Sequence, residues 1–125
     1  MKTKGEIEAK ISEAMVQFEM RHMGRGPQEA RSYIIDDLIL VRLKGALTPA
    51  EQELAKCAGG VELIKKMRST LIDNARPELC RAICDASGAD VREILTDVNV
   101  ASGEHVFILM LGANLGQGLA RKLKP

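Results

Sequence analysis

The sequence contains no tryptophan, and its aromatic residues are one tyrosine and two phenylalanines. Proteins that bind single-stranded nucleic acids use exposed aromatic rings to stack on bases, so this composition argues against that class. Net charge is nearly absent as well, because 18 Lys and Arg are balanced by 17 Asp and Glu to give +1. Without a global field to concentrate polyanions, nucleic acid is not expected to be a partner.

Long apolar runs are also missing. The longest, Val106 to Leu111, is far shorter than the ~20 residues that span a bilayer, and the charged N-terminal stretch MKTKGEIEAKISEAMVQ lacks the apolar core of a secretory signal. The cysteines, Cys57, Cys80 and Cys84, are odd in number and have no disulfide-framework spacing, which favours a reducing compartment. We therefore expect a cytoplasmic protein, which at a membrane would act as a peripheral subunit on the inner face.

The composition that is present fits one soluble globular domain. The 125 residues are 46% hydrophobic and 28% charged, and a chain of this size buries about two-thirds of its unfolded surface in one modest core. Residues 4–112 carry the regular patterns and are predicted to form a single domain. The basic tail 113–125 loses the pattern and is expected to be a mobile extension or a short amphipathic turn.

The first half of the chain predicts a helix, a hairpin and a second helix. Apolar residues recur at helical spacing from Ile7 to His22, and the helix should end near Gly24. Two β-rich runs, ARSYII and LILVRLKG, flank Asp36 and Asp37 at a hairpin tip. The stretch LTPAEQELA then has a capping Thr, a Pro at the first helical position and a Glu three residues after the cap, and its helix should run to about residue 58, stopped by the glycine pair at 59–60.

The second half predicts helix and then strand. Residues 61–86 hold helical phase across Pro77, as one kinked helix or as two helices that break near Arg76. The runs DVREILTDVNV and HVFILMLG form a second hairpin, and the unbroken apolar run places the last strand inside the sheet. The order α-β-β-α-α-β-β predicts an α+β domain, a four-stranded antiparallel sheet of two hairpins with helices mainly on one face.

Several of these motifs together resemble a known family. They are GRGP after the first helix, RSYIIDDLILVRLKGALTPAEQELA, Arg68, RPEL, SGADVREILTDVN and GEHVFILML. The chain is similar to a small bacterial family first described as a domain of unknown function and later labelled MpsC, component of a Na⁺-translocating membrane-potential-generating system. The resemblance covers about residues 4–111. Two departures are Leu95, where a histidine is expected, and a tail that is longer than usual.

The resemblance implies a cytoplasmic accessory protein coupled to a cation or bicarbonate transport system. It supplies no catalytic residues. In the resemblance, residues 24–27 correspond to the family's glycine-arginine turn, and residues 47–51 correspond to its capped helix. Thr96 and Asp97 correspond to its third-strand motif.

Metal and acid-base sites are weighed against simpler explanations. Cys80 and Cys84 are four residues apart on a helix, but a structural zinc site needs four ligands, so small thiols and no metal or cofactor are expected. Turn formation accounts for the aspartates at 36–37, and Asp90 stands apart from them. Asp97 lies in mid-strand, and its expected partner is a lysine or arginine on a neighbouring strand, such as Arg42. No catalytic residue is predicted.

The sharpest site prediction is an anion- or partner-binding pocket. Glycines let backbone N–H groups turn toward a ligand, and arginine offers a planar fork for phosphate or carboxylate. Against it, the turn is also explained by helix capping, and no helix follows it to complete a phosphate cradle. The candidate residues are Gly24, Arg25, Gly26, Arg31, Arg42 and Lys44.

Three function classes follow. The first is a non-enzymatic accessory or regulatory module that forms a homo-oligomer, a dimer, because a small four-stranded sheet leaves edges and a face to cover; a membrane transporter subunit is a further expected partner. The second is a small-ligand, anion or nucleic-acid-binding regulatory domain, which needs the basic side chains to converge. The third, an enzyme, lacks a nucleophile with an evident base.

Overall fold

The computed structural model describes residues 2–123, except for the side chains of residues 120–123. The elements are α1 (Lys4–Met23), β1 (Glu29–Ile35), β2 (Leu38–Lys44), α2 (Pro49–Leu54), α3 (Gly60–Asn74), α4 (Arg76–Ser87), β3 (Val91–Asn99), β4 (Glu104–Leu111) and α5 (Leu115–Leu123). The four strands form one antiparallel sheet in the order β1-β2-β4-β3. The predicted α+β class and its two hairpins are confirmed, and β4 lies inside the sheet as its apolar run indicates.

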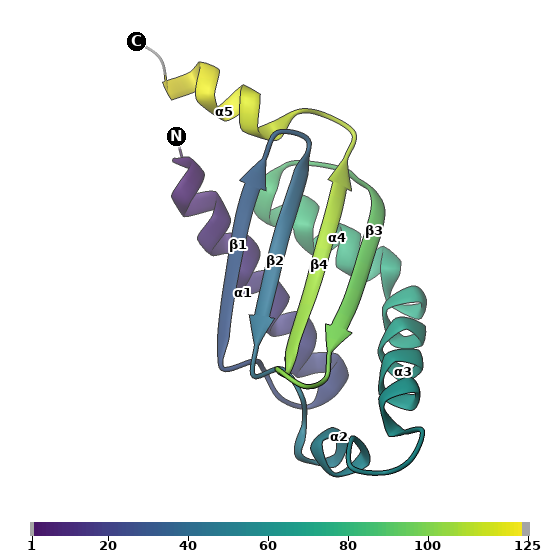
Figure 1. Ribbon diagram of the computed structural model, residues 1–125. Helices are drawn as coiled ribbons and strands as arrows, with labels where there is room; N and C mark the ends of the chain where they lie inside the picture. The colour runs from purple at the N-terminus through teal and green to yellow at the C-terminus, as the bar shows by residue number, and fades with distance from the viewer. Residues whose placement is uncertain (1, 124–125) are drawn as a thin grey trace.

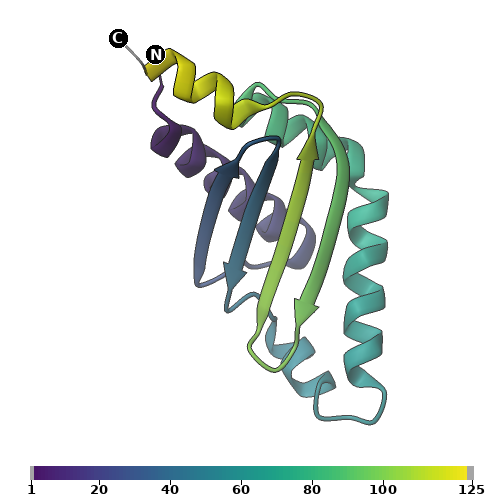
Figure 2. The same cartoon turned by 45° about the horizontal axis from the view of Figure 1, so that its top comes forward.

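Helices α1 and α4 pack side by side against one face of the sheet, while α3 runs down beside the β3 edge (Figures 1 and 2). The main core lies between these two helices and the sheet. It centres on Ile11 and Met15 of α1, Leu79 and Ile83 of α4, and Phe107 of β4. The apolar stripes of the two amphipathic helices are thus buried against the sheet, as expected for a two-layer domain.

The two faces of the sheet differ. Side chains alternate along each strand, so that the inner face is buried under α1 and α4. Figure 1 looks onto the opposite face, over which no element of residues 2–123 is drawn. On this outer face Tyr33, Ile35, Leu95 and Met110 remain exposed.

The helix ends follow the capping signals, with one correction. Gly24 caps α1 in the left-handed conformation, with φ 83°, as expected at this position. Thr48 and Glu51 form the predicted capping box of α2, but α2 ends at Leu54 rather than near residue 58. Gly60 does not stop a helix but is the first residue of α3. A Cβ at this position would lie 1.8 Å from the Leu54 carbonyl oxygen, which only glycine avoids. The second glycine is therefore required by close packing between α2 and α3.

Of the two readings of residues 61–86, the structure has two separate helices. Ala75 leaves the helical conformation, with φ −96° and ψ 10°, between the end of α3 and the start of α4. Pro77 then lies in the first turn of α4, where its missing N–H removes no helical hydrogen bond.

The tail forms helix α5 above the β1–β2 turn (Figure 1). The backbone N–H of Gly116 donates to the Asp36 carbonyl oxygen at 2.9 Å, and Leu119 is buried. Asp36, with φ 53°, lies at the predicted hairpin tip. The mobility expected for 113–125 stays a prediction, and residues 124 and 125 lie outside the described residues. No helix within residues 2–123 is long and apolar enough to cross a bilayer.

Candidate functional site

A group of ionisable side chains is buried where α1, α2, α3 and the sheet meet. Its centre is Arg68 of α3, which is only 2% exposed. It contacts the side chains of Glu51, Glu19 and His105, and His105 in turn contacts Thr96. Together these five residues are called the Arg68 cluster. A guanidinium carries five N–H donors, and in this cluster all five are used.

Arg68 binds Glu51 through a two-pronged contact. Its Nε donates to Glu51 Oε2 at 2.7 Å, and its second terminal nitrogen donates to Glu51 Oε1 at 2.7 Å and to the Ala46 carbonyl oxygen at 2.8 Å. Glu51 Oε1 also accepts the Thr48 backbone N–H at 2.9 Å. One carboxylate therefore both closes the cap of α2 and holds α3 against it.

The remaining terminal nitrogen of Arg68 reaches α1 and the sheet. It donates to Glu19 Oε1 at 3.2 Å and contacts His105 Nδ1 at 3.0 Å. Because a guanidinium cannot accept a hydrogen bond, His105 Nδ1 must be the acceptor. His105 Nε2 then donates to Thr96 Oγ1 at 2.7 Å, which donates to the Val106 carbonyl oxygen at 2.9 Å. A single direction of donation runs from Arg68 to the sheet backbone.

The electrostatics of the cluster favour the ion pair. Burial raises the pKa of the Glu51 carboxyl, but the hydrogen bond from Arg68 and the Thr48 backbone N–H outweigh it, so the pKa lies below its usual value. Burial likewise lowers the pKa of Arg68, and the hydrogen bond to Glu51 and the charge of Glu19 raise it overall. The charged pair is thus the stable form, and no buried side-chain polar atom among the described residues lacks a partner.

The sequence reasoning missed this cluster as a unit. Arg68 lies four residues from both Ile64 and Ile72, on the buried stripe of α3, and Glu19 lies four residues after Met15 on the buried stripe of α1. A charged residue on an apolar helical stripe is the signal that could have found it, because a buried charge needs a partner. The pairing itself could not be read from the sequence, since 49 residues separate Arg68 from Glu19.

A polar hollow of about 160 Å³ opens beside the cluster between α3 and β3. Lys65, Ser69 and Asp97 line its mouth, and Arg68 and His105 line its floor. The predicted basic partner of Asp97 is a lysine, but this lysine is Lys65 of α3, so Arg42 and a location on a neighbouring strand are wrong. Asp97 lies on the edge strand β3, and its carboxylate is 3.1 Å from Lys65 Nζ and accepts a hydrogen bond from the Val98 backbone N–H. Strand β4 lies between Asp97 and Arg42. The Val98 and Lys65 hydrogen bonds hold the pKa of Asp97 below its usual value.

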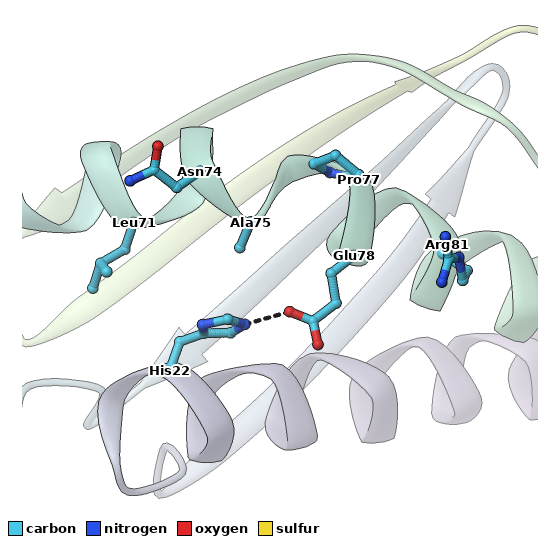
Figure 3. Close-up of a pocket in the computed structure, with 7 residues that line it drawn as sticks. All are labelled: His22, Leu71, Asn74, Ala75, Pro77, Glu78 and Arg81. Atoms are coloured by element: carbon cyan, nitrogen blue, oxygen red, sulfur yellow. Dashed lines mark hydrogen bonds and ion pairs between the residues drawn. The ribbon is translucent and has the colours of Figure 1, made fainter.

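A wider groove of about 430 Å³ lies between the end of α1 and the α3–α4 junction (Figure 3). His22 and Glu78 point toward each other across it, with Nε2 and Oε2 2.6 Å apart, and Arg21 also pairs with Glu78. The hydrogen bonds from His22 and Arg21 lower the pKa of the Glu78 carboxyl. The side chains described along this groove include no Ser, Thr or Cys, so His22 has no adjacent nucleophile to activate.

The predicted anion-binding residues fall into two groups. Gly24, Arg25 and Gly26 lie in the connection from α1 to β1, where Gly24 is a helix cap. The basic side chains lie on the outer sheet face, where Arg31 and Arg42 are direct cross-strand neighbours and Lys44 is opposite Glu29.

Carboxylates already pair with two of these basic groups. Arg31 contacts Glu29 at 2.8 Å, and Arg42 contacts Glu104 at 2.5 and 3.1 Å. These contacts raise the pKa of both arginines. An anion would have to compete with these carboxylates, and anion binding stays a prediction.

The cysteines and aspartates do not converge with other ligands. Within residues 2–123, no three His, Cys, Asp or Glu side chains are grouped to hold a metal ion. Cys84 is near Asp90, with Sγ 3.8 Å from Oδ1, and Cys57 is exposed elsewhere. Asp36 and Asp37 form the β1–β2 turn and are not part of the Arg68 cluster.

Comparison with known proteins decides the family. A family model described as "Na+-translocating membrane potential-generating system (MpsC)" matches residues 3–113. The chain belongs to the MpsC family. This MpsC-family chain is also 35% identical over 122 residues to "Uncharacterized protein YbcI" of Bacillus subtilis (strain 168), a match that covers 98% of both chains. No solved structure matches significantly.

The relative bears on one of the two departures from the family pattern, and the structure bears on the other. Because the match covers 98% of each chain, the tail is not an extension relative to that protein. Leu95 lies on the outer sheet face beside Ile108, whereas Thr96 points inward to His105. A histidine at position 95 would therefore face away from the Arg68 cluster.

Proposed function

We propose that this protein is a non-enzymatic, cytoplasmic accessory or regulatory subunit of a Na⁺-translocating, membrane-potential-generating system. The observation that carries this proposal is the saturation of the Arg68 cluster. Catalysis needs polar groups that point toward a substrate. In the Arg68 cluster the ionisable side chains instead form their hydrogen bonds with one another.

The second polar site supports the same proposal. The His22–Glu78 pair could orient an imidazole, but acyl or phosphoryl transfer also needs a nucleophile or a charge-stabilising pocket in reach. Arg21 contacts the same carboxylate rather than pointing at a free volume for substrate. These contacts tie the end of α1 to the start of α4 and serve the fold.

The link to ion translocation comes from the family. The MpsC family is described as a Na⁺-translocating membrane-potential-generating system. A subunit of this kind would bind an integral membrane component on the cytoplasmic side and change its assembly or activity. The partner we propose is therefore a transporter subunit embedded in the membrane.

The test is co-purification from the native cell. A tagged chain is produced at its natural level, membranes are solubilised in a mild detergent, and bound proteins are identified by mass spectrometry. We expect an integral membrane cation-transport subunit to be enriched over a tagged, unrelated cytoplasmic domain of similar size. Recovery of no membrane protein above that control would contradict the proposal.

A second readout measures function directly. Deletion of the gene should lower the Na⁺-dependent part of the membrane potential, measured with a potential-sensitive dye, and the intact chain should restore it. Substitution of His22 or Glu78, as His22→Ala or Glu78→Gln, should leave that restoration unchanged if neither residue is catalytic. Loss of restoration by both variants, with the fold intact, would favour an enzyme.

A further inference from the structure

One half of the outer face of the sheet has the composition of a buried surface. Strand β2 reads LILV over residues 38–41, and β4 reads VFILML over 106–111, so these stretches of the central strands are apolar on both faces. Strands with one face in water instead alternate apolar and polar residues, and continuous apolar strands are typical of sheets covered on both sides. The helices cover only the inner face (Figures 1 and 2).

The strand register arranges the outer face in four rows. The two apolar rows are Tyr33–Leu40–Ile108–Leu95 and Ile35–Leu38–Met110–Glu93. The next row is Arg31–Arg42–Val106–Asp97, and the last is Glu29–Lys44–Glu104–Asn99, where Lys44 and Glu104 lie one residue beyond the Leu43–His105 pair. Apart from Glu93, apolar side chains fill one half of the face, and the other half is charged except for Val106 and Asn99.

We propose that a second copy of this chain covers the outer face, sheet against sheet, about a two-fold axis parallel to the strands and between β2 and β4. Such an axis places each row opposite the same row of the partner, with the order of the four strands reversed, so that β1 faces β3 and β2 faces β4. The apolar row Tyr33–Leu40–Ile108–Leu95 then meets itself, with Tyr33 over Leu95 of the partner and Leu40 over Ile108 of the partner.

The charged rows become complementary under the same operation. Arg31, on one edge of the sheet, is placed opposite Asp97 of the partner, and Lys44 is placed opposite Glu104 of the partner. Each pair occurs twice, because the contact is isologous. The six ionisable side chains of these two rows comprise three positive and three negative groups, so the two rows carry no net charge.

The alternative axis, across the strands, is disfavoured by the same rows. It would place the Glu29 row of one copy over the apolar Ile35 row of the other and the Arg31 row over the apolar Tyr33 row, so that charges lie against apolar side chains in every pair of rows. The axis parallel to the strands does this only at Glu93, opposite Ile35 of the partner, and at Arg42, opposite Val106 of the partner, where Arg42 keeps its contact with Glu104. The size of the face fits a small dimer. Four strands of about seven residues span roughly 450 Å² in projection, which corresponds to the lower end of specific interfaces, about 1,200 Å² of accessible surface in total.

The first test is the molar mass of the full chain, measured by sedimentation or light scattering over a dilution series. The variant Leu95→Glu places a carboxylate in the apolar row, and we expect at least about tenfold weaker dimerisation. The matched control is Leu63→Glu on α3, because both leucines are 56% exposed and only Leu95 lies on the outer face. The control should dimerise like the unmodified chain.

The second test fixes the axis by charge exchange. Arg31→Glu and Asp97→Arg should each weaken the dimer, since each places like charges opposite one another. Arg31 and Asp97 lie on opposite edges of one sheet, about 14 Å apart across three strand spacings, so they cannot compensate within a chain. The double variant should recover dimerisation, and an equimolar mixture of the two single variants should form a heterodimer. Lys66→Glu, on exposed α3, is the control.

The outcomes separate the possibilities. A monomer at all concentrations, or a dimer that Leu95→Glu leaves intact, overturns the proposal. A dimer that Leu95→Glu disrupts but that the double charge variant does not restore overturns the axis. Circular dichroism and thermal melting of every variant identify loss of fold. The mixing experiment uses only variants whose spectra and melting temperatures match those of the unmodified chain. Co-purification of a membrane subunit is a separate measurement, so failure of either proposal leaves the other standing.

Discussion

Both faces of the sheet carry rows of apolar side chains, but the two faces meet opposite surroundings. Helices bury the apolar residues of the inner face, and the charged side chains that α1, α2 and α3 bury beside it, Glu19, Glu51 and Arg68, are paired. On the outer face, apolar rows remain exposed beside surface ion pairs. A buried charge is retained only with partners, whereas an exposed apolar row needs a second surface. The inner face therefore explains stability, and the outer face points to association.

The largest expected effect is on the inner face, at the centre of the cluster. Arg68→Met removes the guanidinium and leaves two buried carboxyl groups without their partner. We expect a loss of about 3–5 kcal/mol in the free energy of unfolding, measured by urea denaturation with circular dichroism. Lys66→Met, two residues away on exposed α3, is the control and should change stability by less than about 0.5 kcal/mol. A loss below about 1 kcal/mol for Arg68→Met would mean that the cluster adds little to stability.

The same leucine-to-alanine change should separate the two faces. Leu109 of β4 is 0% exposed on the inner face, and Leu109→Ala should cost about 2–5 kcal/mol through lost burial and the cavity left behind. Leu95→Ala on the outer face should cost less than about 1 kcal/mol when the chain is diluted to the monomer. Urea unfolding at low protein concentration measures both, and equal losses would show that the outer face is covered within the monomer.

The pH dependence tests the Glu51 ion pair. The folded pKa of Glu51 is depressed, so its stabilising effect is fully present above the unfolded value, about 4.3, and is lost as the pH falls through the folded pKa. Glu51→Gln should be less stable at neutral pH and should lose less further stability between pH 5 and about pH 3. Urea midpoints across this range provide the measurement. Parallel pH curves for the two proteins would contradict the assignment.

The smallest effect is expected at the helix cap that holds Glu51 in place. Thr48→Ala removes the side-chain oxygen that accepts the Glu51 N–H but leaves the Thr48 backbone N–H, which donates to Glu51 Oε1. The loss should be about 1 kcal/mol in thermal or urea unfolding. Thr48→Ser, which keeps the oxygen, is the matched control. A loss comparable to that of Arg68→Met would place the cap and the ion pair in one cooperative unit.

Local rules accounted for the helix ends and turns. Gly24, the Thr48–Glu51 capping box and Asp36 at the hairpin tip follow from backbone preferences and from side chains a few residues apart. The break at Ala75 was left open, because helical periodicity is the same for one kinked helix and for two helices in phase. The partner of Asp97 was misassigned, since a strand pattern fixes which face a residue lies on but does not give the order of strands.

The sequence by itself determined the α+β class, the two hairpins, the cap of α1, the capping box of α2 and the family, because each depends on periodicity, on short-range spacing or on motif similarity. It gave the element order only in part, since the split of residues 61–86 and helix α5 were not fixed by it. Only the tertiary structure decided that Glu19, Glu51, His105 and Thr96 meet at Arg68, and that apolar and charged rows divide the outer face. Both depend on contacts between segments far apart in the chain. The physical reason is that a buried charge or an apolar strand must be covered or paired, which can be inferred from the sequence pattern. Which residue pairs with it depends on how distant segments pack in the fold.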